Sequence, residues 1–187
     1  MNLQRELFAP APAVAGLVLA EKVISPDEER AIAAHIDAAP LTPFQFGQWE
    51  GKRLTMNYGS GYDYQRGALA DAPPLPEWLE DLRDRLAPLV GLDPGAVQQA
   101  LLIRYDPGAG IGWHRDRPQY DKVIGLSLSA PAKLRLRWRI EGGFERRTVE
   151  LPPRSLYLLS GEVRQEWEHS IAPMDVARRS VTLRTLR

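Results

Sequence analysis

Apolar residues recur at helical spacing in two stretches of the first half of the chain. In the first, Ser25–Glu28 combine a serine at the N-cap position, a proline at the first helical position and a glutamate three residues after the cap, which is the capping-box pattern. Ile32 and Ile36 follow one turn apart, and Pro40 ends the pattern. The second stretch begins near residue 76, and its apolar residues share one helix face: Trp78, Leu79, Leu82 and Leu86. The pattern therefore predicts two helices.

The second half of the chain has the pattern of β-structure. Short runs of β-forming residues alternate with turn signals rich in proline and glycine, as at residues 106–108, 141–143 and 152–153. The runs are Gln99–Tyr105, Gly112–Asp116, Val123–Leu128, Leu134–Ile140, Thr148–Leu151, Ser155–Leu159 and Val181–Leu186. Many short strands at this spacing predict a β-sandwich or jelly-roll barrel, with the two helices packed on its outside. The apolar run Ala13–Ala20 predicts one more strand ahead of the helices.

The length of the chain bounds its organisation. At 187 residues it is long enough for one well-buried core and too short for two ordinary domains, and no linker or repeat divides it. We therefore expect a single α+β, mainly β, domain. Residues 1–96 would form an N-terminal extension with the helices, and residues 97–187 would form the barrel.

The composition narrows the chemistry that the chain can support. It has no cysteine, which excludes disulfides, thiolate nucleophiles and cysteine-bound metals, so a metal site must use His and carboxylates. Its net charge is zero, so a site for a polyanion must come from a local cluster of basic residues. The apolar run near the start is too short to span a bilayer and makes a poor signal peptide. We expect a cytoplasmic, monomeric protein that does not associate with membranes.

Two of the three histidines lie where a metal site could form. In the expected strand Gly112–Asp116, the two-residue period sends His114 and Asp116 to the same face. His169 follows several strands later. Two imidazoles and one carboxylate make up the facial triad of non-haem Fe(II) oxygenases, which leaves positions open for a co-substrate and O₂. The alternative is an exposed His–Asp pair at a strand end, because an isolated H-x-D motif is common.

The last expected strand adds a second chemical feature. Its two-residue period places Arg178, Ser180, Thr182 and Arg184 on one face. Guanidinium groups on the inner face of a barrel are costly unless an anion meets them. The two carboxylates of 2-oxoglutarate would each suit an arginine fork. The alternative is that both arginines pair with internal Asp or Glu residues.

The motifs of the second half follow one another in a recognisable order. They are Tyr105-x-Pro107-Gly108, Gly112-Trp113-His114-x-Asp116, Val123–Leu128, Leu134–Arg137, Pro153–Leu156, Gly161-Glu162-x-Arg164, His169-x-Ile171 and Arg178-x₅-Arg184. In this order and density they resemble the AlkB family of Fe(II)/2-oxoglutarate-dependent dioxygenases. A looser similarity covers residues 53–64, the segment that corresponds to the substrate lid of that family.

The resemblance implies a double-stranded β-helix whose N-terminal extension recognises a nucleotide. It implies Fe(II) as the cofactor, with 2-oxoglutarate and O₂ as co-substrates. The implied iron ligands are His114, Asp116 and His169. The implied 2-oxoglutarate site comprises Arg178 and Arg184, assisted by Tyr105 and Ser180. Members oxidise alkyl groups on nucleobase nitrogens in DNA or RNA, so that an N-methyl group is lost as formaldehyde, and some act on proteins.

Two positions depart from the family pattern. Ile103 occupies the position where many members have an asparagine that contacts 2-oxoglutarate. Pro118 occupies the position where bacterial DNA-repair members have an acidic residue. These departures leave open which residue completes the co-substrate site and which substrate is oxidised.

A glycine-rich segment between the two helices supplies candidates for substrate binding. Aromatic rings can hold an extruded base by stacking, and polar side chains can bond its edge or a phosphate. The candidates are Trp49, Arg53, Asn57, Tyr58, Tyr62 and Tyr64. The alternative is that the aromatic residues form a hairpin that packs against the barrel.

Basic residues also alternate with apolar ones along one expected strand. Lys133, Arg135, Arg137 and Arg139 would share its outer face. This row is consistent with a track for phosphates and equally with a solvated sheet face paired with glutamates.

We expect oxidative demethylation of alkylated nucleic acid as the function. One alternative is an oxygenase of the same chemistry that acts on a protein or a small molecule. The other is a binding module that kept the barrel without its catalysis.

Overall fold

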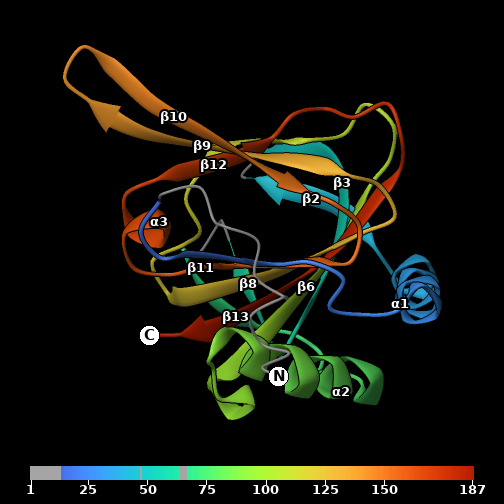
Figure 1. Ribbon diagram of the computed structural model, residues 1–187. Helices are drawn as coiled ribbons and strands as arrows, with labels where there is room; N and C mark the ends of the chain where they lie inside the picture. Colours follow the sequence, from blue (N-terminus) through green and yellow to red (C-terminus); the bar gives the residue numbers. More distant parts are fainter. Residues whose placement is uncertain (1–13, 47, 64–66) are drawn as a thin grey trace.

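Two antiparallel β-sheets face each other in the computed structural model, which describes residues 14–46, 48–63 and 67–187 (Figure 1). The larger sheet has the strand order β1-β11-β8-β13-β6-β3-β2, and the smaller has the order β10-β9-β12-β7. The strands of the larger sheet are β1 (Leu17–Ala20), β2 (Thr42–Phe46), β3 (Trp49–Tyr58), β6 (Val97–Tyr105), β8 (Tyr120–Leu128), β11 (Ser155–Leu159) and β13 (Arg178–Leu186). Those of the smaller sheet are β7 (Ile111–His114), β9 (Ala132–Ile140), β10 (Gly143–Leu151) and β12 (Glu168–Ile171). This arrangement confirms the predicted jelly roll.

The two predicted helices cover the outer face of the larger sheet (Figure 1). Helix α1 (Pro26–Ala38) begins with the expected capping box, because the Ser25 and Glu28 side chains each accept a hydrogen bond from the other residue's backbone N–H. Helix α2 is Glu77–Leu86. Both helices contribute to one apolar cluster with the outward side chains of β6, β8, β11 and β13. Because the helices cover one face of the larger sheet, its opposite face points toward the smaller sheet and forms the interior.

A second apolar cluster fills the space between the sheets. It includes Leu134 and Leu136 from β9, and Trp167, which lies between α3 (Gly161–Gln165) and β12. The smaller elements are β4 (Ser60–Asp63) and β5 (Ala68–Asp71), which pair with each other, and two 3₁₀ turns at Ala87–Val90 and Pro94–Ala96. A cavity adjoins this cluster, since Val123, Leu134 and Tyr157 belong to the cluster and line the cavity.

The structure differs from the sequence expectations in three elements. Strand β12 was not expected, and it joins β7 to β9 within the smaller sheet. Strand β7 ends at His114, so Asp116 lies beyond the strand in which it was expected. Strands β2 and β3 pair with each other and extend the larger sheet, because β3 also pairs with β6 over residues 54–58. The N-terminal half therefore contributes strands to the same sheet as the C-terminal half.

Among the described helices, none combines the length and the apolarity that crossing a membrane requires.

Candidate metal and co-substrate site

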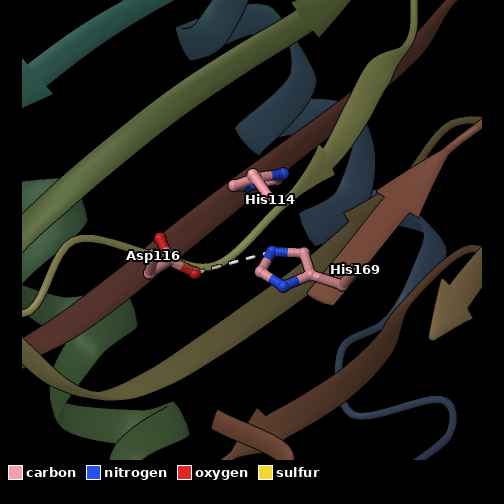
Figure 2. A group of neighbouring side chains, drawn as sticks. All are labelled: His114, Asp116 and His169. Carbon is pink, nitrogen blue, oxygen red and sulfur yellow. Dashed lines mark ion pairs between the residues drawn. The ribbon is translucent and has the colours of Figure 1, made fainter. Parts of the chain in front are cut away.

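His114, Asp116 and His169 converge between the two sheets (Figure 2). The pairing of β7 with β12 sets His114 directly opposite His169, and Asp116 follows two residues after the end of β7. One potential ligand atom from each of the three side chains lies within 4.8 Å of the others. Asp116 Oδ2 is 3.5 Å from His169 Nε2, and the centres of the two imidazole rings are 4.2 Å apart. The sequence prediction that these three side chains meet is confirmed.

The hydrogen bond of His114 favours one neutral tautomer. Its Nδ1 lies 2.9 Å from the carbonyl oxygen of Gly112. Because a carbonyl oxygen can only accept, Nδ1 carries the proton and donates it, and Nε2 keeps its lone pair for a metal. The backbone of β7 thus orients the ring of its own last residue.

Electrostatics hold the three groups in the protonation states that a metal ion needs. Burial lowers the pKa of His169 to about 3, and the nearby Arg184 guanidinium acts in the same direction, against the opposing effect of the Asp116 carboxylate. Burial also lowers the pKa of His114. Burial alone would raise the pKa of Asp116, but Arg184 and the two imidazoles outweigh it and hold this pKa well below its ordinary value. At neutral pH the site therefore presents two neutral imidazoles and one carboxylate.

Arg184 pairs directly with the proposed carboxylate ligand. Its Nη2 lies 2.8 Å from Asp116 Oδ1, and its Nη1 donates to Gln99 Oε1 at 2.9 Å. The fully buried Gln99 in turn donates to Asn57 Oδ1 on β3 at 2.9 Å. For Arg184, the alternative from the sequence analysis, an ion pair with an internal acidic residue, is therefore correct. The acidic residue is Asp116, one of the three proposed metal ligands.

Arg178 has a different environment. Only 1% of it is exposed, and its guanidinium donates to Ser127 Oγ and lies over the ring of Tyr105 at 5.1 Å. Within the described residues it forms no ion pair, and its buried Nη1 has no hydrogen-bond partner. A buried cation with an unused N–H is costly unless an anion reaches it. The donor set therefore fits a carboxylate beside the ring of Tyr105.

A cavity of about 540 Å³ connects these groups. The three triad residues, Arg184 and Tyr105 line it together with Thr182 and Tyr157. Arg178 and Ser180 are buried on the same face of β13 but are not among the residues that line the cavity. On the predicted face of β13, Thr182 and Arg184 thus line the cavity, and Arg178 and Ser180 do not.

The candidates for substrate binding fall into three groups. Arg53 and Asn57 line the cavity, and Arg53 lies 3.9 Å over the ring of Phe44, which also lines it. Tyr58 points to the opposite face of β3 and packs against the apolar cluster under the helices, so it does not reach the cavity. The side chains of Trp49 and Tyr62 lie outside the described part of the structure, as does the whole of Tyr64. For Tyr58, the alternative of packing is therefore the correct one.

The sequence analysis did not single out Tyr157. It is 9% exposed and lines the cavity, and burial raises the pKa of its phenol to about 12, so it remains a neutral donor. Its ring lies across β8 at Gly125, where an added Cβ would be only 2.1 Å from the Tyr157 Cζ atom. Within the described chain its hydroxyl makes no hydrogen bond, which leaves it free to bond a ligand in the cavity. No local motif could reveal this, because the register of β11 on β8 brings the tyrosine to the glycine.

Comparisons with known proteins agree with this geometry. Residues 18–187 match the model of the 2OG-Fe(II) oxygenase superfamily. The tRNA (carboxymethyluridine(34)-5-O)-methyltransferase alkbh8 of Xenopus tropicalis is 32% identical over 161 residues, which are 84% of this chain and 25% of that protein. The alkylated DNA repair protein ALKBH8 homolog of Arabidopsis thaliana is 26% identical over 84% of this chain and 51% of that protein. The chain thus spans a quarter to a half of the length of these relatives.

Two solved structures share the fold. The structure of OsALKBH1 has a TM-score of 0.67 at 16% identity and covers 94% of this chain and 99% of its own. A prolyl-4-hydroxylase of Pseudomonas putida also has a TM-score of 0.67, at 20% identity, and covers 94% of this chain and 95% of its own. With a family match over residues 18–187, the chain belongs to the 2OG-Fe(II) oxygenase superfamily, and it is similar to AlkB homologues within it.

Proposed function

We propose that the chain removes alkyl groups from nucleobases of DNA or RNA, with Fe(II) held by His114, Asp116 and His169. The observation that carries the metal assignment is the convergence of two neutral imidazoles and one ionised carboxylate in a cavity. This donor set leaves three positions of an octahedral ion open, as non-haem oxygenases require. The bound iron would supply the oxidising power, with 2-oxoglutarate and O₂ as co-substrates, and the chain would supply binding and orientation.

Arg178 would bind a carboxylate of 2-oxoglutarate. Its unused Nη1, the lack of any ion pair within the described residues and its contacts with Ser127 and Tyr105 support this role. Arg184 would instead fix Asp116 and keep it ionised, since it already bonds that carboxylate. Its buried Nε has no partner among the described residues and remains available for the second carboxylate. Ser180, two residues further along the same face of β13, would contribute its hydroxyl to the same site.

Tyr157 would add the hydrogen bond that Ile103 cannot make. Ile103 lines the cavity with an apolar side chain, while the neutral Tyr157 hydroxyl has no hydrogen-bond partner among the described residues. A phenol donates to a carboxylate in a charge-assisted hydrogen bond. The hydroxyl of Tyr157 on β11 would thus supply the hydrogen-bond donor that Ile103 on β6 lacks.

The proposed substrate class is supported by the cavity lining and by the relatives. Phe44 and Trp113 provide aromatic faces, and Arg53 and Asn57 provide polar groups that could bond a base edge. The cavity volume lies within the roughly 300–1,000 Å³ of small-ligand sites. The relatives are described as a tRNA methyltransferase and an alkylated DNA repair protein. DNA or RNA repair in the cytoplasm, by a monomer, is the form of this activity that we propose.

Mass spectrometry of alkylated oligonucleotides would test this proposal. Methylated DNA and RNA strands would be incubated with the protein, Fe(II), 2-oxoglutarate and ascorbate. We expect loss of the methyl group matched by succinate release, and neither product with His169→Ala. Succinate release by the wild type without change in any strand would contradict a nucleic-acid substrate. That result would favour a protein or small-molecule substrate, in keeping with the fold shared with a prolyl hydroxylase.

A further inference from the structure

The outer face of the smaller sheet carries a row of basic side chains. Because Leu134 and Leu136 point into the core, the alternate residues of β9 point outward: Lys133, Arg135, Arg137 and Arg139. The β9–β10 register sets Phe144 opposite Arg139 and Arg146 opposite Arg137. Directly paired residues of antiparallel strands share a face. We call the surface formed by Lys133, Arg135, Arg137, Arg139, Phe144 and Arg146 the arginine face.

Aromatic rings organise the guanidinium groups of this face. Three of them surround the ring of Phe144: Arg137 at 4.4 Å, Arg146 at 5.5 Å and Arg139 at 5.8 Å from its centre. Trp113 on β7 lies under Arg137 at 4.6 Å and under Arg135 at 5.1 Å. Cation–π contacts hold guanidinium groups without using up their N–H donors. The arginines are thus gathered together and still able to bond an anion.

Acidic residues neutralise only part of this charge. Arg137 pairs with Glu168 at 2.5 Å, and Lys133 pairs with Glu150 at 3.5 Å. In the described ranges Arg135, Arg139 and Arg146 form no ion pair, and the last two are exposed. Like charges held around one ring repel each other, and an anion placed between them would remove that cost. Since the whole chain has zero net charge, this concentration is local to one face.

The arginine face leads to the cavity. Trp113, which contacts two of its arginines, also lines the cavity and directly precedes His114. At the other end the β9–β10 hairpin extends beyond the rest of the molecule at the upper left of Figure 1. A chain that left the cavity past Trp113 would run along the arginines toward the hairpin tip. The basic residues of β9 recur every second residue, about 6.6 Å apart, which suits successive phosphates of an extended strand.

We propose that the arginine face binds the phosphodiester backbone of a single-stranded nucleic acid next to the nucleotide held in the cavity. This inference rests on the proposed function, because it assumes that a nucleotide enters the cavity. A single strand is favoured because the row follows one narrow hairpin and because an unpaired base enters a pocket without the cost of extrusion. The phosphates give affinity that is independent of sequence, and the cavity selects the base.

A charge-neutralising double variant, Arg139→Gln with Arg146→Gln, would test the arginine face. Its matched control is Arg30→Gln with Arg85→Gln, which removes the same charge from exposed positions on α1 and α2. Binding of end-labelled, unmodified oligothymidylate and oligouridylate would be followed by fluorescence anisotropy over a range of salt concentrations. We expect the first variant to bind about tenfold more weakly at low salt, and its salt slope to fall by about 1.4, since each phosphate contact on a single strand contributes about 0.7. The control should bind like the wild type.

Three results would overturn the proposal. One is unchanged affinity and salt slope in the Arg139/Arg146 variant, and another is an equal loss in the control. The third is displacement of the oligonucleotide by polyglutamate as readily as by unlabelled oligonucleotide, which would indicate a site for any polyanion. Dealkylation of a methylated strand separates this failure from that of the proposed function. If the wild type dealkylates while the variant keeps full affinity, only the arginine face is wrong, whereas succinate release without any dealkylation would refute the nucleic-acid substrate itself.

Discussion

Two arginines on the inner face of β13, Arg178 and Arg184, differ in what neutralises them. Arg184 bonds Asp116, whereas the fully buried Arg178 has no ion pair within the described residues. A buried charge without a counter-charge is costly, so an apolar side chain of similar volume in its place should not destabilise the fold, whereas removing one partner of a buried pair costs about 3–5 kcal/mol. The same substitution should therefore affect the two positions in opposite ways.

We predict that Arg178→Met keeps or raises the thermal stability of the ligand-free protein, whereas Arg184→Met lowers it. Arg178→Met should also abolish the stabilisation by 2-oxoglutarate in the presence of Mn(II), because the carboxylate loses its partner. Thermal unfolding with and without the two ligands measures both effects. A marked loss of ligand-free stability in Arg178→Met would show that the cation is already compensated.

Tyr157 provides a test of the co-substrate site that leaves the triad and the arginines intact. A hydrogen bond to a charged group contributes about 1.5–3 kcal/mol, so Tyr157→Phe should weaken 2-oxoglutarate binding by about ten- to a hundredfold. Calorimetric titration of the Mn(II)-loaded protein with 2-oxoglutarate measures this. Metal affinity should not change, because the ring and its contact with Gly125 remain. Equal co-substrate affinity in both proteins would place the hydroxyl away from the ligand.

The buried imidazoles should make the metal-free protein sensitive to acid. The pKa of His169 is about 3 in the folded state, against an ordinary value of 6.5. Between these values the unfolded chain binds a proton that the folded chain does not, so stability falls as pH drops below about 6.5. Asp116 contributes in the same direction only at lower pH, below its ordinary value of 3.8.

We predict that the free energy of unfolding of the metal-free protein decreases from about pH 7 to about pH 5, and that His169→Gln reduces this slope. Urea unfolding at several pH values measures it, with a limit of about 1.4 kcal/mol per pH unit for one proton. An identical slope in the variant would mean that other groups cause the loss.

At the scale of elements, the alternation of β3 separates two roles. Asn57 points into the cavity and bonds Gln99, which bonds Arg184. Its neighbour Tyr58 packs on the opposite face, against the apolar cluster under the helices. One face of the β2–β3 hairpin thus lines the cavity. Its other face packs against the apolar cluster beneath the helices.

We predict that Tyr58→Ala destabilises the protein by about 3 kcal/mol, as for the truncation of a packed aromatic side chain, while 2-oxoglutarate decarboxylation per folded molecule is kept. Asn57→Ala should have a small effect on stability and reduce turnover of the methylated strand. Denaturant unfolding and assays of dealkylation and succinate release distinguish the two. If Tyr58→Ala instead removed dealkylation at unchanged stability, the ring would have to reach the substrate.

Elements with a strong local signal were predictable from the sequence. The capping box of α1 lies within four residues, and the alternation of β13 places Arg178 and Arg184 on the inner face. The triad was also predictable, since H-x-D is local and the family motifs supplied the distant histidine. Strand β12 was missed because it is four residues long, and its pairing with β7 and β9 is set by the tertiary structure.

The features that escaped prediction depend on register between distant strands. The pairing of β13 with β6 brings Arg184 to Gln99, and the pairing of β11 with β8 brings Tyr157 to Gly125. A shift of one residue in either pairing would send these side chains to the opposite face. The sequence shows which residues can carry the chemistry, but the sheet register decides which of them meet.

At the scale of the whole molecule, the two faces of the smaller sheet carry different side chains. Its inner face supplies the imidazoles of His114 and His169, and its outer face supplies the arginine face. Trp113 lies at the edge strand where the two faces meet, because β7 is the last strand of that sheet. One thin layer would thus hold the iron on one side and the backbone of the substrate on the other.

Anaerobic titration with Fe(II) and 2-oxoglutarate, followed by visible absorption, tests the central claim most directly. A 2-oxoglutarate that chelates a protein-bound Fe(II) gives a metal-to-ligand charge-transfer band, which free iron and protein do not show. We predict this band with saturation at one iron per chain, its loss in His169→Ala, and its absence when succinate replaces 2-oxoglutarate. A wild-type protein that shows no band, or a band of the same intensity in His169→Ala, would contradict the assignment of His114, Asp116 and His169 as the iron site.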